Sequence, residues 1–189
     1  FITSEAELGY RWLTLHGFTI FFYWLYFAQS AILLAFVAAE AAQVHGGLAL
    51  RPLAWAGVGG MVSGLIVQHV GAWLGAPLLY DGSPEIAGDE PAQAAMFYAG
   101  YLLLGLGLLL IAIVAIATAL RGKTARSPAP WSALGFGAIG WSGLVIVSAI
   151  AIMMAFLPAF LWSIGWGAAP LQHQMSWHLL FHNLHYLPL

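Results

Sequence analysis

Long apolar segments separated by short polar ones make up almost the whole chain. Four or five of these segments exceed the roughly 18 apolar residues that are typical of a membrane span. Backbone groups find no water inside a bilayer, so spans of this kind are predicted to be helical. The pattern predicts an all-α, polytopic membrane helix bundle forming one domain, residues 1–189. Its five expected spans are residues 10–42, 53–79, 93–120, 131–160 and 173–189.

The polar segments predict how these spans cross the membrane. Four of the five basic residues lie in segments 43–52 and 121–130, which antiparallel spans place on the same side. The positive-inside rule makes that side cytoplasmic. The N-terminus and the acidic segment 80–92 are then expected outside, and Trp162 and Trp166 suit an outer interfacial belt.

Composition narrows the possible chemistry. The chain is 62% hydrophobic and 6% charged, against about one quarter charged in soluble domains. It has no cysteine, which excludes disulfides, iron–sulfur ligation by thiolates and thiol catalysis, and leaves histidine as the borderline-soft metal ligand. It has no basic stripe, so we expect no nucleic-acid partner.

The last thirteen residues, 177–189, carry three of the seven histidines: His178, His182 and His185. Their i, i+4, i+7 spacing places them on one helix face, with Tyr186 four residues after His182. Such groups are costly to bury in a membrane without partners. The face therefore predicts a metal site, a proton path or both, and a water-filled pore lined by these histidines is the alternative. His178 and His185 are either structural or support a ligand from the next shell of contacts.

A second candidate ligand site is His16, in the sequence LTLHG of the first span. The predicted topology puts His16 and His182 roughly 9 and 14 Å below the outer surface, so the two lie at comparable depths. His16 is either an axial heme ligand, with Gly17 leaving room beside the ring, or a histidine bonded to a neighbouring helix.

The other polar side chains have simpler interpretations. His69 is expected at the interface, and His45 and His173 are expected to be solvated. Glu40, near the cytoplasmic end of the first span, either snorkels to the interface or guards a proton entry.

Two motifs resemble a known family. The string RWLTLHGFTIFFYWLYFAQ, residues 11–29, resembles the second helix of subunit I of heme–copper oxidases, and FHNLHY, residues 181–186, matches the H-x-x-x-Y spacing of the sixth helix. The resemblance implies that His16 is an axial ligand of the low-spin heme, His182 a CuB ligand, and Tyr186 the catalytic tyrosine cross-linked to that histidine. The five spans would be helices two to six of a fold with twelve or more helices, closest to the B-type branch.

The resemblance also implies an activity. A protein of this family reduces O2 to water with electrons from a cytochrome c-type or similar donor and couples the reaction to proton translocation. It implies a low-spin heme, a high-spin heme and copper (CuB) as cofactors. It implies oxidase subunit II, an electron donor protein and membrane lipid as partners. The expected location is a bacterial or archaeal cytoplasmic membrane, and the chain is expected to be a fragment, because the family's first helix and its later metal ligands are absent.

Departures from the family pattern keep alternatives open. Phe181 and Asn183 stand where the family usually has Gly and Pro on either side of the copper-binding histidine. His178 as the copper ligand is the alternative register. Alternative functions are a nitric-oxide reductase of the same superfamily, a heme-free proton-conducting transporter with a His-lined pore, and a cytochrome b carrier that uses His16 and His69.

Overall fold

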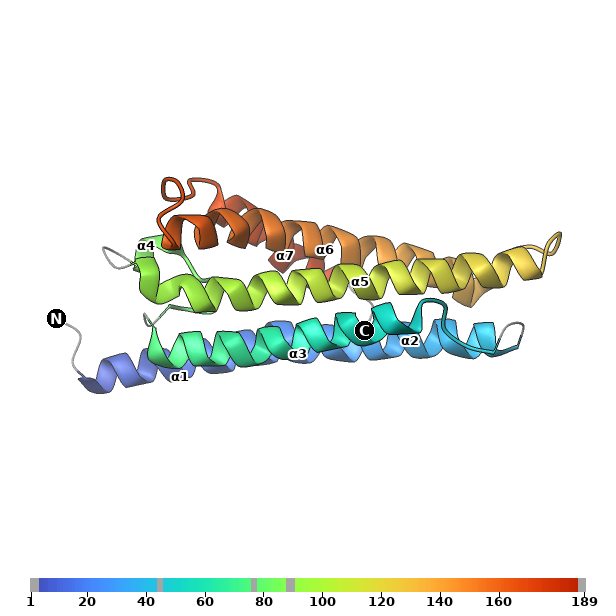
Figure 1. Cartoon of the computed structure of the whole chain (residues 1–189), viewed down its shortest axis with the longest axis horizontal. Helices are drawn as coiled ribbons and strands as arrows, with labels where there is room; N and C mark the ends of the chain where they lie inside the picture. Colours follow the sequence, from blue (N-terminus) through green and yellow to red (C-terminus); the bar gives the residue numbers. More distant parts are fainter. Residues whose placement is uncertain (1–3, 44–45, 76–77, 88–90, 187–189) are drawn as a thin grey trace.

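A computed structural model describes residues 4–43, 46–75, 78–87 and 91–186, without the side chains of residue 4 and of 184–186. The described ranges contain helices and no strand, which confirms the all-α prediction (Figure 1). The first helical segment consists of α1 (Ser4–Phe18), the π-helix η1 (Thr19–Trp24) and α2 (Leu25–Ala42) in direct succession. The other long helices are α3 (Arg51–Leu74), α5 (Ala95–Ala125), α6 (Ala133–Ser163) and α7 (His173–Tyr186). Two short helices, α4 (Pro84–Ala87) and the 3-10 turn η2 (Pro91–Ala94), precede α5.

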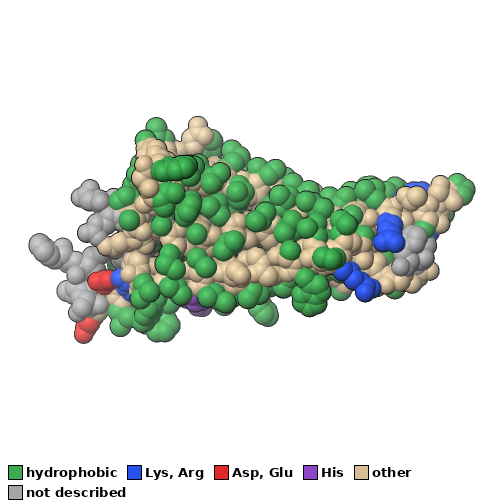
Figure 2. All heavy atoms as spheres, viewed as in Figure 1, with side chains coloured by type: hydrophobic (Ala, Val, Ile, Leu, Met, Phe, Trp, Pro, Cys, Tyr) green, Lys and Arg blue, Asp and Glu red, His purple; other side chains and the backbone are tan. Residues whose placement is uncertain are grey.

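Within the described residues, four continuous helical segments are long and apolar enough to cross a membrane. They are Glu5–Ala42, Arg51–Leu74, Pro91–Ala125 and Ala133–Ser163. Large apolar side chains cover the outside of the bundle along its length (Figure 2), as expected for a surface in contact with lipid. The chain is thus an integral membrane helix bundle. The last predicted span, 173–189, is described as far as Tyr186, as a helix of 14 residues.

The two basic segments lie at the same end of the bundle, as the topology predicts. Figure 1 places the connection between α2 and α3 and the connection between α5 and α6 at one end. The backbone N–H of Ala49 donates to Thr118 Oγ1 at 3.1 Å, and Arg126 forms an ion pair with Glu40. Figure 2 shows Lys and Arg side chains gathered at this end, which we call the basic end.

The remaining basic side chain, Arg11, lies at the opposite end and terminates α3. Its guanidinium pairs with Glu7 at 2.7 Å and donates to the carbonyls of Trp73 and Gly75 at 2.6 and 2.7 Å. These carbonyls belong to a helix C-terminus, where a cation is favourable. This contact helps to end α3 at Leu74, five residues before the predicted end of that span.

Helices α3 and α5 pack closely because glycines face each other. A Cβ added to Gly100 would lie 2.4 Å from the Gln68 Cβ and 2.8 Å from the Gly64 carbonyl oxygen, and one added to Gly64 would lie 2.7 Å from the Gly100 carbonyl oxygen. Small residues that let two backbones approach are a common way to hold helices together in lipid. The glycine-rich sequence of α3 therefore permits its close contact with α5.

We expect Gly100→Ala to lower the thermal stability of the purified protein. Backbone and Cβ atoms cannot move aside easily, so overpacking here is expected to cost about 1–3 kcal/mol or more. Gly140→Ala in α6 is the matched control, because nothing lies within 4 Å of a Cβ at that position. Both changes gain the same helix propensity, about 1 kcal/mol. Equal melting temperatures for the two variants in detergent would contradict the glycine contact.

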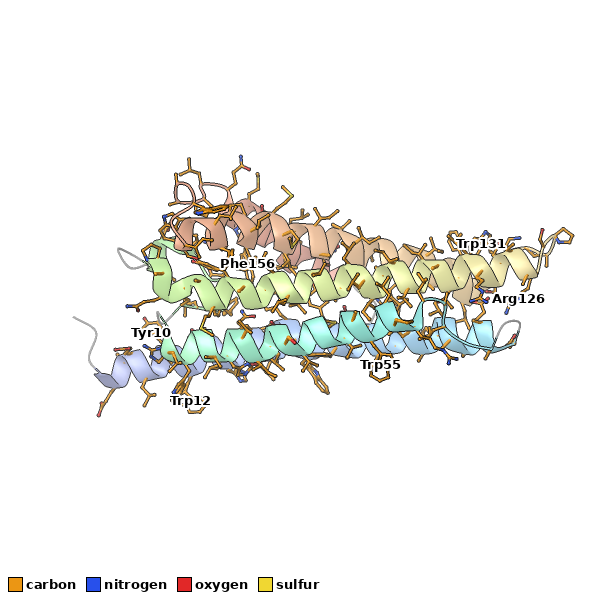
Figure 3. All side chains as sticks on the ribbon, viewed as in Figure 1. Tyr10, Trp12, Trp55, Arg126, Trp131 and Phe156 are labelled. Atoms are coloured by element: carbon orange, nitrogen blue, oxygen red, sulfur yellow. The ribbon has the colours of Figure 1, made fainter. Side chains whose placement is uncertain are left out.

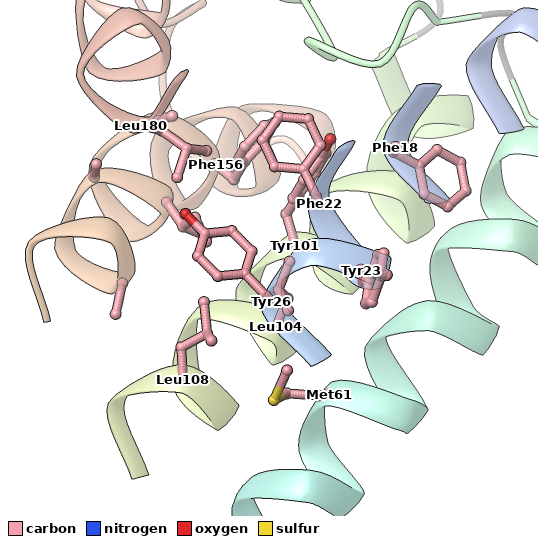
Figure 4. Packing of buried hydrophobic residues seen from close by; sticks show 14 of the residues in the cluster. Phe18, Phe22, Tyr23, Tyr26, Met61, Tyr101, Leu104, Leu108, Phe156 and Leu180 are labelled. Atoms are coloured by element: carbon pink, nitrogen blue, oxygen red, sulfur yellow. The ribbon is translucent and has the colours of Figure 1, made fainter. Parts of the chain in front are cut away.

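An aromatic cluster attaches α7 to the other helices. Tyr101 of α5 stacks on Phe156 of α6 with ring centroids 4.0 Å apart, and Trp177 of α7 lies 5.0 Å from Phe22 of η1. Figure 4 shows Phe22, Tyr101 and Phe156 converging in this cluster, with Leu180 of α7 close to them. These contacts fix which side of α7 faces the bundle.

Candidate functional site

His16 lies in the last turn of α1, on the outer face of the helix. Thr14 and Phe18 on either side of it in sequence are buried, whereas the His16 side chain is exposed. None of the described residues forms a hydrogen bond or ion pair with it. Gly17 is buried against Tyr80, since a Cβ there would lie 2.8 Å from the Tyr80 Cβ. That packing accounts for the glycine, rather than the predicted space beside the imidazole.

The π-helix η1 follows His16 directly. A π-helical turn inserts extra residues into a helix, changes which side chains face inward, and is often found near functional sites. In η1 it turns Phe22 and Tyr23 into the core. The Tyr23 hydroxyl lies 2.9 Å from Gln68 Oε1 and 3.0 Å from the Gly100 carbonyl oxygen, which joins η1 to α3 and α5. The sequence shows only a dense aromatic block here, and nothing in it predicted the π-helix.

The predicted histidine face of α7 points away from the bundle as far as its side chains are described. His178 and His182 are exposed, while Trp177, Leu180 and Asn183 are buried. Neither exposed histidine has a hydrogen bond to a described residue. The side chains of His185 and Tyr186 lie outside the described part, so the catalytic role predicted for Tyr186 stays a prediction.

Asn183 fixes the rotation of α7 about its axis. Its Nδ2 donates to the carbonyl of Leu144 and to Ser148 Oγ, both at 2.7 Å. A proline, which the oxidase family usually has at this place, could make neither bond. Asn183 therefore ties α7 to α6 with two hydrogen bonds, and it holds the adjacent His182 on the outer face.

Two other histidines are engaged by the fold through both ring nitrogens. His69 places Nδ1 2.8 Å from the Leu65 carbonyl oxygen and Nε2 3.1 Å from Thr19 Oγ1, so the neutral ring donates to the first and accepts from the second. His69 is half-buried, in contact with η1.

His173 was predicted to be solvated, and that prediction is wrong. Its side chain is buried, with Nδ1 3.1 Å from the Ala155 carbonyl oxygen and Nε2 2.8 Å from the Asp81 carbonyl oxygen. His173, the first residue of α7, therefore joins the segment around Asp81 to the C-terminal part of α6, although the three are distant in sequence. The described histidines thus fall into two groups, engaged (His69, His173) and available (His16, His178, His182).

Several buried polar groups lie on α2 and α6, and we call this set the polar line. Its members include Tyr26 Oη, Gln29 Oε1 and Trp141 Nε1, which are buried and have no hydrogen-bond partner in the described chain. The Tyr26 phenol lies beside Ser148, which in turn accepts the Asn183 amide. Buried polar groups without protein partners commonly bind internal water. The Tyr26–Ser148 part of the polar line lies next to Asn183, the sequence neighbour of His182.

Glu40 lies on the same face of α2, at the basic end. Helical spacing places Tyr26, Gln29, Phe36 and Glu40 on one face of α2, and the Phe36 ring lies 6.4 Å from that of Trp141. The Glu40 carboxylate accepts hydrogen bonds from Arg126 and from the Ser132 hydroxyl, the N-cap of α6. Glu40 is thus partly buried and paired at the basic end.

The described residues do not form a complete metal site. Within them, no three or more His, Asp or Glu side chains lie together in a way that could hold a metal ion. His16 and His182 can each offer one neutral imidazole nitrogen, which suits one axial heme ligand and one copper ligand. A complete set would need ligands beyond these described side chains.

Comparison with protein-family models, with curated proteins and with solved structures found no match to this chain. A functional assignment therefore rests on the two motifs and on the geometry of the histidines.

Proposed function

We propose that this chain is part of subunit I of a respiratory heme–copper oxidase, which reduces O2 to water and couples the reaction to proton translocation. The observation that carries the proposal is the division of the histidines. His16 and His182, in the two motifs that resemble the family, have ring nitrogens that the described fold leaves without protein partners. His69 and His173, outside those motifs, have both ring nitrogens engaged.

The surface around His16 supports binding of a heme. Trp12, Leu13 and Ile20 are exposed and lie three or four residues from His16, so they share its face. Figure 3 shows Trp12 pointing away from the bundle. A flat apolar macrocycle could cover these side chains while one imidazole nitrogen holds the iron. The heme would supply reversible one-electron transfer, and the apolar face would keep water from it.

The outer face of α7 supports a copper ligand at His182. Asn183 holds the helix in a fixed rotation, so His182 is presented without competing hydrogen bonds from the described residues. His178, one turn earlier on the same face, is the alternative ligand. Tyr186 is proposed as the catalytic tyrosine from the motif alone. Low-spin heme, high-spin heme and copper are the proposed cofactors, with the remaining ligands outside the described residues.

The polar line between α2 and α6 supports proton translocation. It would carry protons from Glu40 at the basic end, through internal water, to the α7 histidines. The same line also favours the second candidate function, a heme-free proton-conducting transporter. We propose a bacterial or archaeal cytoplasmic membrane as the location, with the basic end inside, and subunit II and an electron donor protein as partners.

Optical spectra and metal content of the intact protein that contains this chain test the proposal. We expect low-spin and high-spin heme bands in the reduced-minus-oxidised spectrum, and copper bound in stoichiometric amount. A protein without any heme signal would sink the oxidase proposal in favour of a transporter. Non-heme iron in place of copper would indicate a nitric-oxide reductase, and low-spin heme without copper would indicate a cytochrome b carrier.

A further inference from the structure

A groove opens between α2 and α3 at the basic end. The N-terminal helix contacts α3 through α1 and η1, whereas α2 packs mainly on α5 and α6. The two helices therefore separate toward this end and leave a groove of about 310 Å³. Its lining residues are Leu34, Leu48, Arg51, Ala54, Trp55 and Val58.

The groove combines an apolar wall with one cation at its mouth. Arg51 begins α3 and is exposed, and one of its N–H groups donates to the Gly46 carbonyl at 3.0 Å. A guanidinium has five N–H donors, so donors remain for a phosphate, which arginine can bind in a bidentate manner. None of the lining residues is acidic.

The depth of the groove fits a lipid rather than a small soluble anion. Val58 follows Arg51 by seven residues, so the apolar wall extends roughly 10 Å along α3 from the Arg51 backbone toward the membrane centre. Trp55 is 76% exposed one turn from Arg51, and Figure 3 shows it pointing outward from α3. An indole at this level is typical of the boundary between headgroups and acyl chains.

We propose that this groove is a specific site for an anionic phospholipid of the leaflet at the basic end. The phosphate binds the Arg51 guanidinium, and one acyl chain lies along Ala54, Val58 and Leu34. The occupant is assigned by charge complementarity, because a zwitterionic lipid carries a cation that an arginine repels, and a free anion would leave the apolar wall uncovered. The site does not depend on the oxidase assignment.

Native mass spectrometry of the intact protein in detergent tests the site. Phosphatidylglycerol and phosphatidylcholine with identical chains are titrated separately, and retained lipid is counted. We expect phosphatidylglycerol to bind more tightly, and Arg51→Gln to weaken it by about tenfold or more, because a charge-assisted contact is lost. Val58→Trp should weaken both lipids by filling the groove.

Arg121→Gln is the matched control, since it removes the same charge from an exposed position at the same end. It should leave binding of phosphatidylglycerol unchanged. Equal loss in both arginine variants would indicate a diffuse electrostatic effect and overturn the site. Equal retention of the two lipids by the unaltered protein, or full binding by Arg51→Gln, would also overturn it and leave a neighbouring helix or bulk lipid as the occupant. Inorganic phosphate is titrated in the same way. If it is retained as tightly as phosphatidylglycerol, the groove is an anion site without a lipid, and the proposal is overturned.

Discussion

Replacing His16 with alanine is expected to abolish the low-spin heme signal of the intact protein, together with its oxygen consumption. The imidazole is exposed and has no hydrogen-bond partner among the described residues, so its loss removes the proposed iron ligand and little structure. Removing a group that hydrogen-bonds to a metal ligand typically lowers metal affinity or activity roughly 10–100-fold. Removing the ligand itself should lower them further. The measurement is the reduced-minus-oxidised spectrum, read beside total heme.

The control for this experiment is His69→Ala. That variant loses the contacts to Thr19 and Leu65 and should be less stable by about 1–3 kcal/mol, yet it should keep both heme bands. A further variant, His16→Gly, leaves space for free imidazole, and added imidazole should restore part of its low-spin band. Added imidazole should not restore the stability that His69→Ala loses. An unaltered low-spin band in His16→Ala would remove His16 from the heme site. A band lost in both variants would indicate the bis-histidine arrangement of a cytochrome b carrier.

The sequence predicted the features of the fold that depend on local composition. Apolar length predicts helices because a bilayer leaves the backbone no other partner, and alternation of direction places segments 43–52 and 121–130 at one end. The structure confirms the all-α bundle and the shared end. The closing of α3 at Leu74 was not predicted, because it involves Arg11, a residue more than sixty positions away.

The candidate site was predictable only in part, for the same reason. Spacing places His178 and His182 on one face, but it did not indicate that both side chains would be exposed on the outside of α7. Spacing cannot reveal that Asn183 bonds Leu144 or that His173 is enclosed by Asp81 and Ala155, because those partners come from other helices and loops. Polar residues inside apolar spans were the available sign of the line between α2 and α6, yet Ser148 and Trp141 drew no attention until their neighbours were known.

The bonded side chains and the exposed histidines have the same physical cause. In a membrane, a polar side chain either finds a partner inside the bundle or is presented to something outside it. Asn183 and His173 have partners inside the bundle, and their hydrogen bonds set the position of α7. Within the described structure, His16 and His182 are instead presented to the outside of the bundle. An exposed imidazole on an apolar surface is costly unless a ligand or another helix covers it, which is why these two positions, rather than the engaged histidines, suit a cofactor.

Removal of His182 is the sharpest test of the copper site. We expect His182→Ala to lose stoichiometric copper and oxygen reduction while it keeps the low-spin heme, because the change removes the proposed copper ligand on α7 and leaves α1 untouched. His178→Ala is a closely matched control, since both residues are exposed on the same helix and neither is bonded by a described residue. Copper per protein, heme spectra and melting temperature are measured for both variants.

The pattern of losses decides between the two registers and the transporter. Copper lost only from His182→Ala assigns that histidine as the ligand, and copper lost only from His178→Ala assigns the alternative register. Equal melting temperatures are expected for both variants, because the buried contacts of Trp177, Leu180 and Asn183 hold α7 in place. If copper and heme are absent throughout, while proton flux into liposomes falls in both variants, the face lines a conducting pore. Since both side chains lie one turn apart, a pore should respond to either change, whereas a metal site should respond chiefly to its ligand.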